Sequence, residues 1–171
     1  MKTMKTRNIT HAALSLTLIF IFFLLFRGVS NILNSILIPV VLYFNISRFT
    51  WKEFLAVVLT MLIISFLFFI QQIFFFLLYV LLAIILFQLM NKRSRFLTKI
   101  SLLTAGAGIG FLLSINLTDI LLGTNIKKAL LAITQGSQIM FLSLIVMEAI
   151  IVSLGLLLIT NQMEKRIENY N

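Results

Sequence analysis

The sequence predicts an all-α, polytopic membrane protein, folded as a single transmembrane domain over residues 1–171. Hydrophobic residues make up 61% of the chain and the mean hydropathy is +1.12, more than a water-soluble domain of 171 residues can bury. The apolar residues also form runs long enough to cross a bilayer as helices. Every acidic residue except Glu148 lies outside these runs, so composition and pattern agree on the class.

Six apolar runs are the expected transmembrane helices. They extend from Asn8 to Phe26, Val29 to Phe44, Leu55 to Ile70, Ile73 to Met90, Ile100 to Thr118 and Ile139 to Thr160. The second and third runs have 16 residues each, which is short for a hydrocarbon core of about 30 Å. The 36 residues from Leu55 to Met90 exceed the length of one crossing, so we predict a tight hairpin at Gln71-Gln72 rather than one long helix.

The distribution of basic residues predicts that both termini are cytoplasmic. With the N-terminus inside, only Arg27, Lys127 and Lys128 face outward. Eleven basic residues then face the cytoplasm: Lys2, Lys5, Arg7, Arg48, Lys52, Lys92, Arg93, Arg95, Lys99, Lys165 and Arg166. This asymmetry favours six crossings of a bacterial cytoplasmic membrane. It also accounts for the net charge of +9 without a nucleic-acid partner.

Glu148 is the one acid inside an apolar run, and it lies near the middle of the segment from Ile139 to Thr160. At about 1.5 Å of rise per residue, it is within roughly 2 Å of the midpoint of that helix. An acid at this depth costs about 2.5 to 3.5 kcal/mol, so we expect Glu148 to face protein or water rather than lipid. Two interpretations stay open: a carboxylate that binds a ligand, or a protonated carboxyl that bonds to a neighbouring helix.

Other polar residues gather toward the outer ends of the expected helices. Asn31, Asn34 and Ser35 follow an i, i+3, i+4 spacing, which places them on one face of the second helix. A polar face of a membrane helix should point into the bundle or a wet cavity. We therefore expect an outward-opening substrate pocket with Glu148 at its floor. Its expected lining residues are Glu148, Arg27, Asn31, Asn34, Asn116 and Asp119. The alternative is that helix ends are polar because they meet headgroups and water.

Small residues recur every four positions in the fifth helix, at Gly106, Gly110, Ser114 and Thr118. Such a stripe lets another helix approach closely, and we predict that it packs within the chain.

The connection that follows contains a further element. Residues Ile126 to Thr134 can form a short amphipathic helix between hinge glycines at Gly123 and Gly136. This helix would lie flat on the outer leaflet or cover the mouth of a pocket.

The sequence contains no catalytic or cofactor-binding pattern. It has no cysteine, and its single histidine, His11, is expected at the opposite membrane face from Asp119. No HExxH motif and no nucleophile with a neighbouring base is present. We therefore expect neither enzymatic activity nor a cofactor or metal, and ATP-driven work would require partner subunits.

The layout resembles the substrate-binding S components of energy-coupling factor transporters, and equally a set of uncharacterised bacterial membrane proteins related to them. The resemblance rests on the six spans, the short second span, the basic loop after the fourth span and the opening stretch MKTRNITHAALSLTLIF. In that family an alanine-xxx-alanine motif of the first helix docks on the coupling subunit. Ala13 and Thr17 occupy the corresponding spacing here, with threonine in place of the second alanine.

The resemblance implies a protein that binds a vitamin-like micronutrient from outside, together with a coupling membrane subunit and ATPase subunits. One alternative is a non-catalytic scaffold or regulatory subunit of a cell-envelope complex. Another is a small proton-linked carrier that uses Glu148, which the lack of a three-plus-three internal repeat disfavours. A substrate pocket requires the outer polar groups to converge, whereas a scaffold would leave them splayed.

Overall fold

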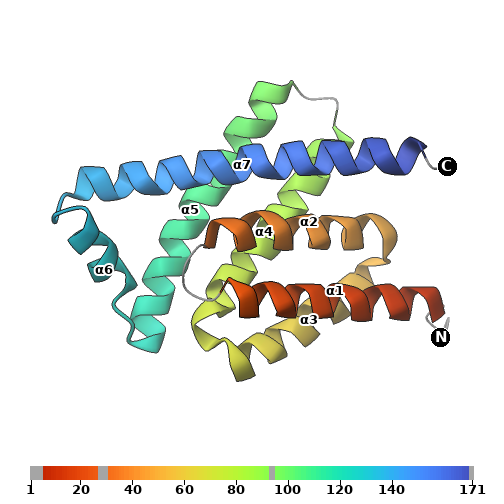
Figure 1. Cartoon of the computed structure of the whole chain (residues 1–171), viewed down its shortest axis with the longest axis horizontal. Helices are drawn as coiled ribbons and strands as arrows, with labels where there is room; N and C mark the ends of the chain where they lie inside the picture. Colours follow the sequence, from red (N-terminus) through yellow and green to blue (C-terminus); the bar gives the residue numbers. More distant parts are fainter. Residues whose placement is uncertain (1–5, 27–30, 93–94, 170–171) are drawn as a thin grey trace.

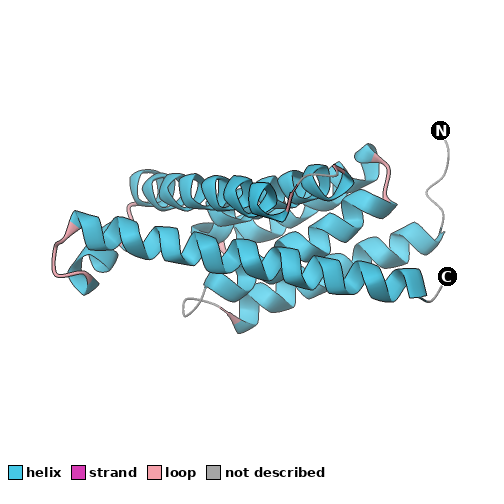
Figure 2. Cartoon of the chain, turned by 90° about the horizontal axis from the view of Figure 1, so that it is seen from above, coloured by secondary structure: helices cyan, strands magenta, loops and turns pink. Residues whose placement is uncertain are grey.

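The computed structural model describes residues 6–26, 31–92 and 95–169, and these ranges form an all-helical fold without a strand. The elements are α1 (Thr6–Leu25), α2 (Asn31–Arg48), α3 (Trp51–Phe68), the 3-10 turn η1 (Ile70–Gln72), α4 (Ile73–Asn91), α5 (Phe96–Leu122), α6 (Ile126–Ile133) and α7 (Gln138–Asn169). Figure 2 shows that the described loops between the helices are short. The expected all-α class is confirmed.

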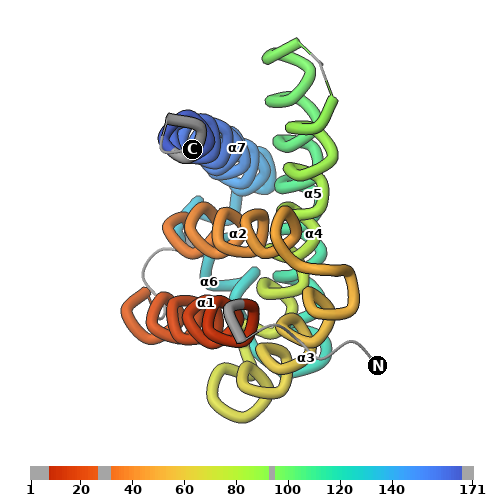
Figure 3. Tube along the Cα trace, turned by 90° about the vertical axis from the view of Figure 1, so that its right-hand side faces the viewer, coloured from red at the N-terminus to blue at the C-terminus, as the bar shows by residue number. Residues whose placement is uncertain are grey.

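The helices form two layers. Helices α1, α2 and α7 lie side by side with α2 in the middle, and α3, α4 and α5 pack obliquely across them (Figures 1 and 3). Helix α1 begins at the same end of the molecule at which α2 and α7 end, and α6 lies at the opposite end (Figure 1). Helix α2 therefore contacts α1, α4 and α7, which makes it the most enclosed long helix of the described chain.

Five helical segments are long and apolar enough to cross a membrane. They are Asn8–Leu25, Trp51–Phe68, Ile70–Asn91, Phe96–Leu122 and Gln138–Arg166. Large apolar side chains are exposed along them, among them Leu25, Ile109 and Ile139, as expected for surfaces that meet lipid. The chain is therefore a multi-pass membrane protein. Helix α2 is a shorter apolar helix that contains Pro39, so the sixth crossing stays a prediction.

The break between the third and fourth helices is confirmed. Helix α3 ends at Phe68, and η1 separates it from α4 at Gln71 and Gln72, where the chain reverses direction (Figure 1). The backbone N–H of Gln72 donates to the carbonyl of Phe69 at 2.8 Å, which closes this tight turn. A hairpin rather than one continuous helix therefore joins α3 and α4.

Helix α3 begins earlier than the apolar run that predicted it. Its first residue is Trp51 rather than Leu55, because a capping box formed by Thr50 and Glu53 stabilises the first turn of α3. The hydroxyl oxygen of Thr50 accepts from the backbone N–H of Glu53 at 3.4 Å, and a carboxylate oxygen of Glu53 accepts from the N–H of Thr50 at 2.9 Å. The capping residues are polar, so hydropathy alone placed this boundary too late.

The small-residue stripe of α5 packs against α4, as predicted. A Cβ atom at Gly110 would lie only 2.0 Å from Cδ1 of Leu78, and one at Gly106 would lie 3.1 Å from Cδ1 of Ile85. The Ser114 hydroxyl donates to the backbone carbonyl of Phe74 at 3.2 Å. The absent side chains thus let the two helices approach closely.

Candidate functional site

Helix α2 carries two polar residues into the centre of the bundle. Asn34 and Ser35 are both 0% exposed, although they lie among apolar neighbours on a helix enclosed by α1, α4 and α7. Neither the amide nitrogen nor the amide oxygen of Asn34 has a hydrogen-bond partner among the described residues. A buried polar group without a partner costs about 1 to 3 kcal/mol. Packing stability alone therefore does not explain the presence of an asparagine at position 34.

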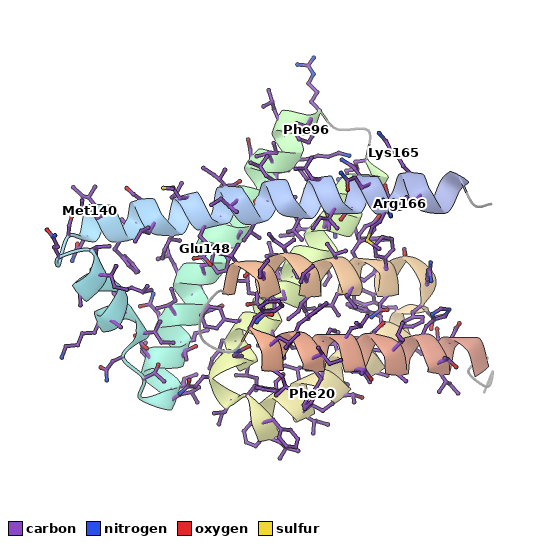
Figure 4. The ribbon with its side chains drawn as sticks, in the orientation of Figure 1. Phe20, Phe96, Met140, Glu148, Lys165 and Arg166 are labelled. Carbon is purple, nitrogen blue, oxygen red and sulfur yellow. The ribbon has the colours of Figure 1, made fainter. Side chains whose placement is uncertain are left out.

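Two other helices, α4 and α7, contribute further polar groups near Asn34 and Ser35. The Tyr79 side chain of α4 is completely buried, and its hydroxyl adjoins that of Ser35. The Glu148 carboxyl is half-buried and lies within electrostatic reach of Tyr79. Figure 4 shows Glu148 on the side of α7 that faces the start of α2. Ser35, Tyr79 and Glu148, with Asn34 beside Ser35 on α2, are called the inner polar cluster below.

Close helix contacts position this cluster. Gly108 of α5 faces Ala149 of α7, with 3.8 Å between the Ala149 Cβ and the place of a Cβ at position 108. This contact sits next to Glu148 and fixes α7 on α5, while α5 is fixed on α4 through Gly110. These two close approaches fix the positions of α7, which carries Glu148, and α4, which carries Tyr79, relative to α5. That Glu148 faces protein or water rather than lipid stays a prediction; its side chain is half-buried.

The other predicted pocket residues have different surroundings. The Asn116 amide donates to the backbone carbonyl of Leu112 at 2.7 Å, within its own helix. Asn34 is fully buried and Glu148 is half-buried, whereas Asn116, which is also half-buried, has a partner within its own helix. Asn31 is the first residue of α2, and its side chain lies outside the described part. Arg27 likewise lies outside the described residues.

Asp119 caps α6. One carboxylate oxygen accepts from the Thr124 hydroxyl at 2.5 Å and from the backbone N–H of Ile126 at 2.8 Å, and the other accepts from the N–H of Lys127 at 2.9 Å. A carboxylate at a helix N-terminus satisfies free N–H groups and complements the helix dipole. The structure therefore places Asp119 at the α5–α6 junction rather than in the inner polar cluster.

The expected amphipathic helix is confirmed, and the two glycines expected as its hinges bracket it. Helix α6 spans Ile126–Ile133. Gly123 ends α5 with a φ of 64°, and Gly136 precedes α7 with a φ of 78°, both in the left-handed region that favours glycine. Helix α6 contacts both α5 and α7 at the end of the bundle (Figure 1). It is thus tied to the ends of the two helices that flank the inner polar cluster.

The expected docking residues lie on an exposed surface. Ala13 and Thr17 of α1 are both exposed, and the Thr17 hydroxyl donates to the carbonyl of Ala13 at 2.9 Å. Because that hydroxyl is satisfied within its own helix, the pair presents a small, mostly apolar surface. Such a surface is compatible with either lipid or another helix.

A cleft at the other end of the molecule was not anticipated from the sequence. It has a volume of about 220 Å³ and lies between α1, the end of α2 and the end of α7. Its lining residues are His11, Leu14, Ser15, Leu18, Val41, Phe44, Asn45, Arg48, Phe49 and Met163. In the sequence, His11 stood alone and Arg48 was informative only for orientation, so no local pattern joined them.

No metal centre is assigned within the described ranges, because no group of three His, Asp or Glu side chains comes together there. Comparison of the chain with family models, with curated proteins and with solved structures finds no match.

Proposed function

We propose that this chain is the substrate-binding membrane subunit of an ATP-driven importer, and that it binds a small, polar, vitamin-like solute at the inner polar cluster. The observation that carries the proposal is Asn34, whose amide is fully buried and lacks partners among the described residues. A bundle selected only for stability gains nothing from such a group. A bound solute with its own donors and acceptors would satisfy it.

The cluster offers complementary chemistry to such a solute. The Asn34 amide supplies two donors and an acceptor, and the Glu148 carboxyl can accept from an N–H or O–H group or pair with a positive charge. Tyr79 adds a hydroxyl and a flat ring. Because Glu148 lies at an apolar depth, a hydrogen bond to it is little weakened by competing water. The solute class that fits is polar and either neutral or cationic.

The direction of entry is proposed from α6. This helix covers the end of the bundle that the charge distribution predicts to be exterior, and its two glycine hinges flank the connections to α5 and α7. Asp119 holds its first turn in place. Delivery of the solute requires ATPase subunits and a coupling membrane subunit, with the exposed Ala13–Thr17 surface of α1 as the docking surface.

A second candidate is a non-catalytic scaffold or regulatory subunit of a cell-envelope complex. It is favoured by the local partners of Asn116 and Asp119, because these polar residues do not converge with Glu148. In this case the exposed face of α1 would bind an envelope protein rather than a coupling subunit.

Native mass spectrometry of the full chain, purified in mild detergent, separates the two candidates. We expect a retained small molecule and a co-purifying pair of ATPases. The Asn34→Leu variant should lose the small molecule, while Ser143→Leu, an exposed position on α7, should keep it. Co-purification of an envelope enzyme without ATPases, and without a small molecule, would establish the scaffold instead.

A further inference from the structure

The cleft at the end where α1 begins combines polar and apolar walls. Its apolar side is formed by residues such as Leu14, Leu18 and Val41, and its polar side by His11, Asn45 and Arg48. It is separate from the inner polar cluster, which lies toward the α6 end of the bundle (Figures 1 and 4). Ligand binding at this cleft is therefore independent of the proposed transport function.

Asn45 is the polar centre of this cleft. Its side chain is only 5% exposed, and its amide oxygen accepts from the Ser15 hydroxyl at 2.8 Å, which links α1 to α2. The amide nitrogen is buried and has no acceptor among the described residues. The Ser15 hydroxyl also lies 2.9 Å from the backbone carbonyl of His11. With the amide oxygen turned to Ser15, the amide nitrogen is offered to the cleft as a donor.

The electrostatic character of the cleft is positive. Arg48 is exposed at its edge, His11 is half-buried, and no carboxylate lines it. Two carboxylates at this end of the molecule are bonded elsewhere. Glu53 accepts from the Asn8 amide and the Thr50 backbone, and Glu164 accepts from the Tyr43 hydroxyl. Among the side chains that the structure describes, no competing acid therefore faces the donors of the cleft.

The apolar wall opens toward the surface that lipid covers. Leu14 is 59% exposed and Met163 is 41% exposed, so the cleft continues onto the apolar exterior of α1 and α7. Arg48 ends α2, at the level where headgroups are expected. A ligand that fits has an anionic head near Arg48 and Asn45 and an apolar tail along Leu14. The leaflet at this end is predicted to be cytoplasmic, where anionic lipids attract basic residues.

We propose that this cleft binds a phosphate-type anionic group, supplied by the headgroup of an anionic phospholipid. Arg48 contributes charge and a forked donor, which suits phosphate geometry. Asn45 contributes the buried donor, and Leu14 and Met163 contact the first part of an acyl chain. The same phosphate chemistry could be supplied by a free phosphate compound, and the apolar opening favours the lipid.

The test is thermal unfolding of the full chain in neutral detergent, titrated separately with short-chain phosphatidylglycerol, short-chain phosphatidylcholine and inorganic phosphate. We expect a saturable rise in Tm with phosphatidylglycerol only. Arg48→Gln should raise the half-saturating lipid concentration about tenfold. Lys52→Gln removes the same charge four residues away and outside the cleft, and it should leave that concentration unchanged.

A second variant keeps the shape of the cleft. Asn45→Asp preserves the acceptor for Ser15 but replaces the donor with a carboxylate, so the lipid-dependent shift should disappear. Asn91→Asp makes the same change at an exposed position and should retain the shift. Equal shifts with both lipids, or equal losses in Arg48→Gln and Lys52→Gln, would overturn the proposal. A full shift with phosphate alone would overturn the lipid assignment in favour of a free phosphate compound.

Discussion

Gly155 of α7 packs directly on Ile36 of α2. A Cβ atom at position 155 would lie 2.7 Å from Cδ1 and 3.1 Å from Cγ1 of Ile36. Ile36 follows Asn34 and Ser35 on α2, and Gly155 is two turns after Glu148 on α7. This contact therefore sets the distance between α2, which carries Asn34 and Ser35, and α7, which carries Glu148.

Reporter fusions test the predicted topology. Fusions within residues Asn45–Glu53 and Asn91–Lys99 should report a cytoplasmic location, and fusions at Gln71-Gln72 and within Ile120–Gln138 should report the exterior. The reason is the concentration of basic residues on one side of six crossings. An exterior signal from Asn91–Lys99 would refute this orientation. A cytoplasmic signal at Gln71-Gln72 would instead mean that α3 and α4 do not cross the membrane.

Gly110→Leu should destabilise the bundle, because the new side chain would enter the space of Leu78 and push α4 from α5. Overpacking of this kind costs about 1 to 3 kcal/mol. Thermal unfolding in detergent measures the change. Ser143→Leu adds similar bulk at an exposed position and should leave Tm close to that of wild type. If both variants unfolded like wild type, the α4–α5 contact would not support the fold.

Substitutions of Glu148 distinguish a ligand-binding carboxylate from a structural one. Glu148→Gln keeps the shape and the hydrogen-bonding capacity but replaces a charge-assisted bond with a neutral one. This should weaken solute binding or uptake about tenfold, or roughly 1 to 2 kcal/mol, with little change in Tm. A structural carboxyl predicts the reverse: full activity in Glu148→Gln and a lowered Tm in Glu148→Leu. Measuring uptake and Tm for both variants distinguishes the ligand-binding role of Glu148 from the structural one.

Asn34→Leu should leave the free energy of unfolding unchanged or raise it, because it replaces an unpartnered buried amide with an apolar side chain of similar size. Solute binding should be lost. Chemical or thermal unfolding gives the first quantity and native mass spectrometry the second. A marked loss of stability would mean that the amide has a structural partner. Retained binding would exclude Asn34 from the site.

Asp119→Ala should loosen α6, because the N–H groups of Ile126 and Lys127 would lose their acceptor. Loss of a capping side chain costs about 0.5 to 2 kcal/mol, and the effect should be local. Hydrogen exchange should become faster over Ile126–Ile133 while α4 keeps its protection. Asp119→Asn retains one acceptor oxygen and should give an intermediate rate. Unchanged exchange in Asp119→Ala would exclude the capping role.

The helical framework could be read from the sequence because its signals are local. The two amides at Gln71-Gln72 mark the break that η1 makes, and Gly123 and Gly136 occupy the left-handed conformations that end α5 and precede α7. The stripe through Gly110 predicted a close helix contact because small side chains let two helix backbones approach. Such features depend on the composition of a few neighbouring residues.

The details of both candidate sites could not be predicted because they depend on how helices cross. Tyr79 lies in a long apolar run, and its meeting with Ser35 requires the oblique packing of α4 across α2. Asn45 meets Ser15 only because α1 lies beside the end of α2. Asp119 was expected to line a pocket, but the path of the chain after Gly123 places the first turn of α6 against its carboxylate.

The proline in α2 has a mechanical consequence. Asn34 and Asn45 are eleven residues apart, so they lie about three turns and roughly 16 Å from each other, near the same helical face. Pro39 lies between them and lacks the N–H that would donate to the preceding turn. The two halves of α2 are thus joined by one hydrogen bond fewer than in a regular helix. A change in the bend of α2 at Pro39 would therefore shift the buried amide of Asn34 relative to that of Asn45.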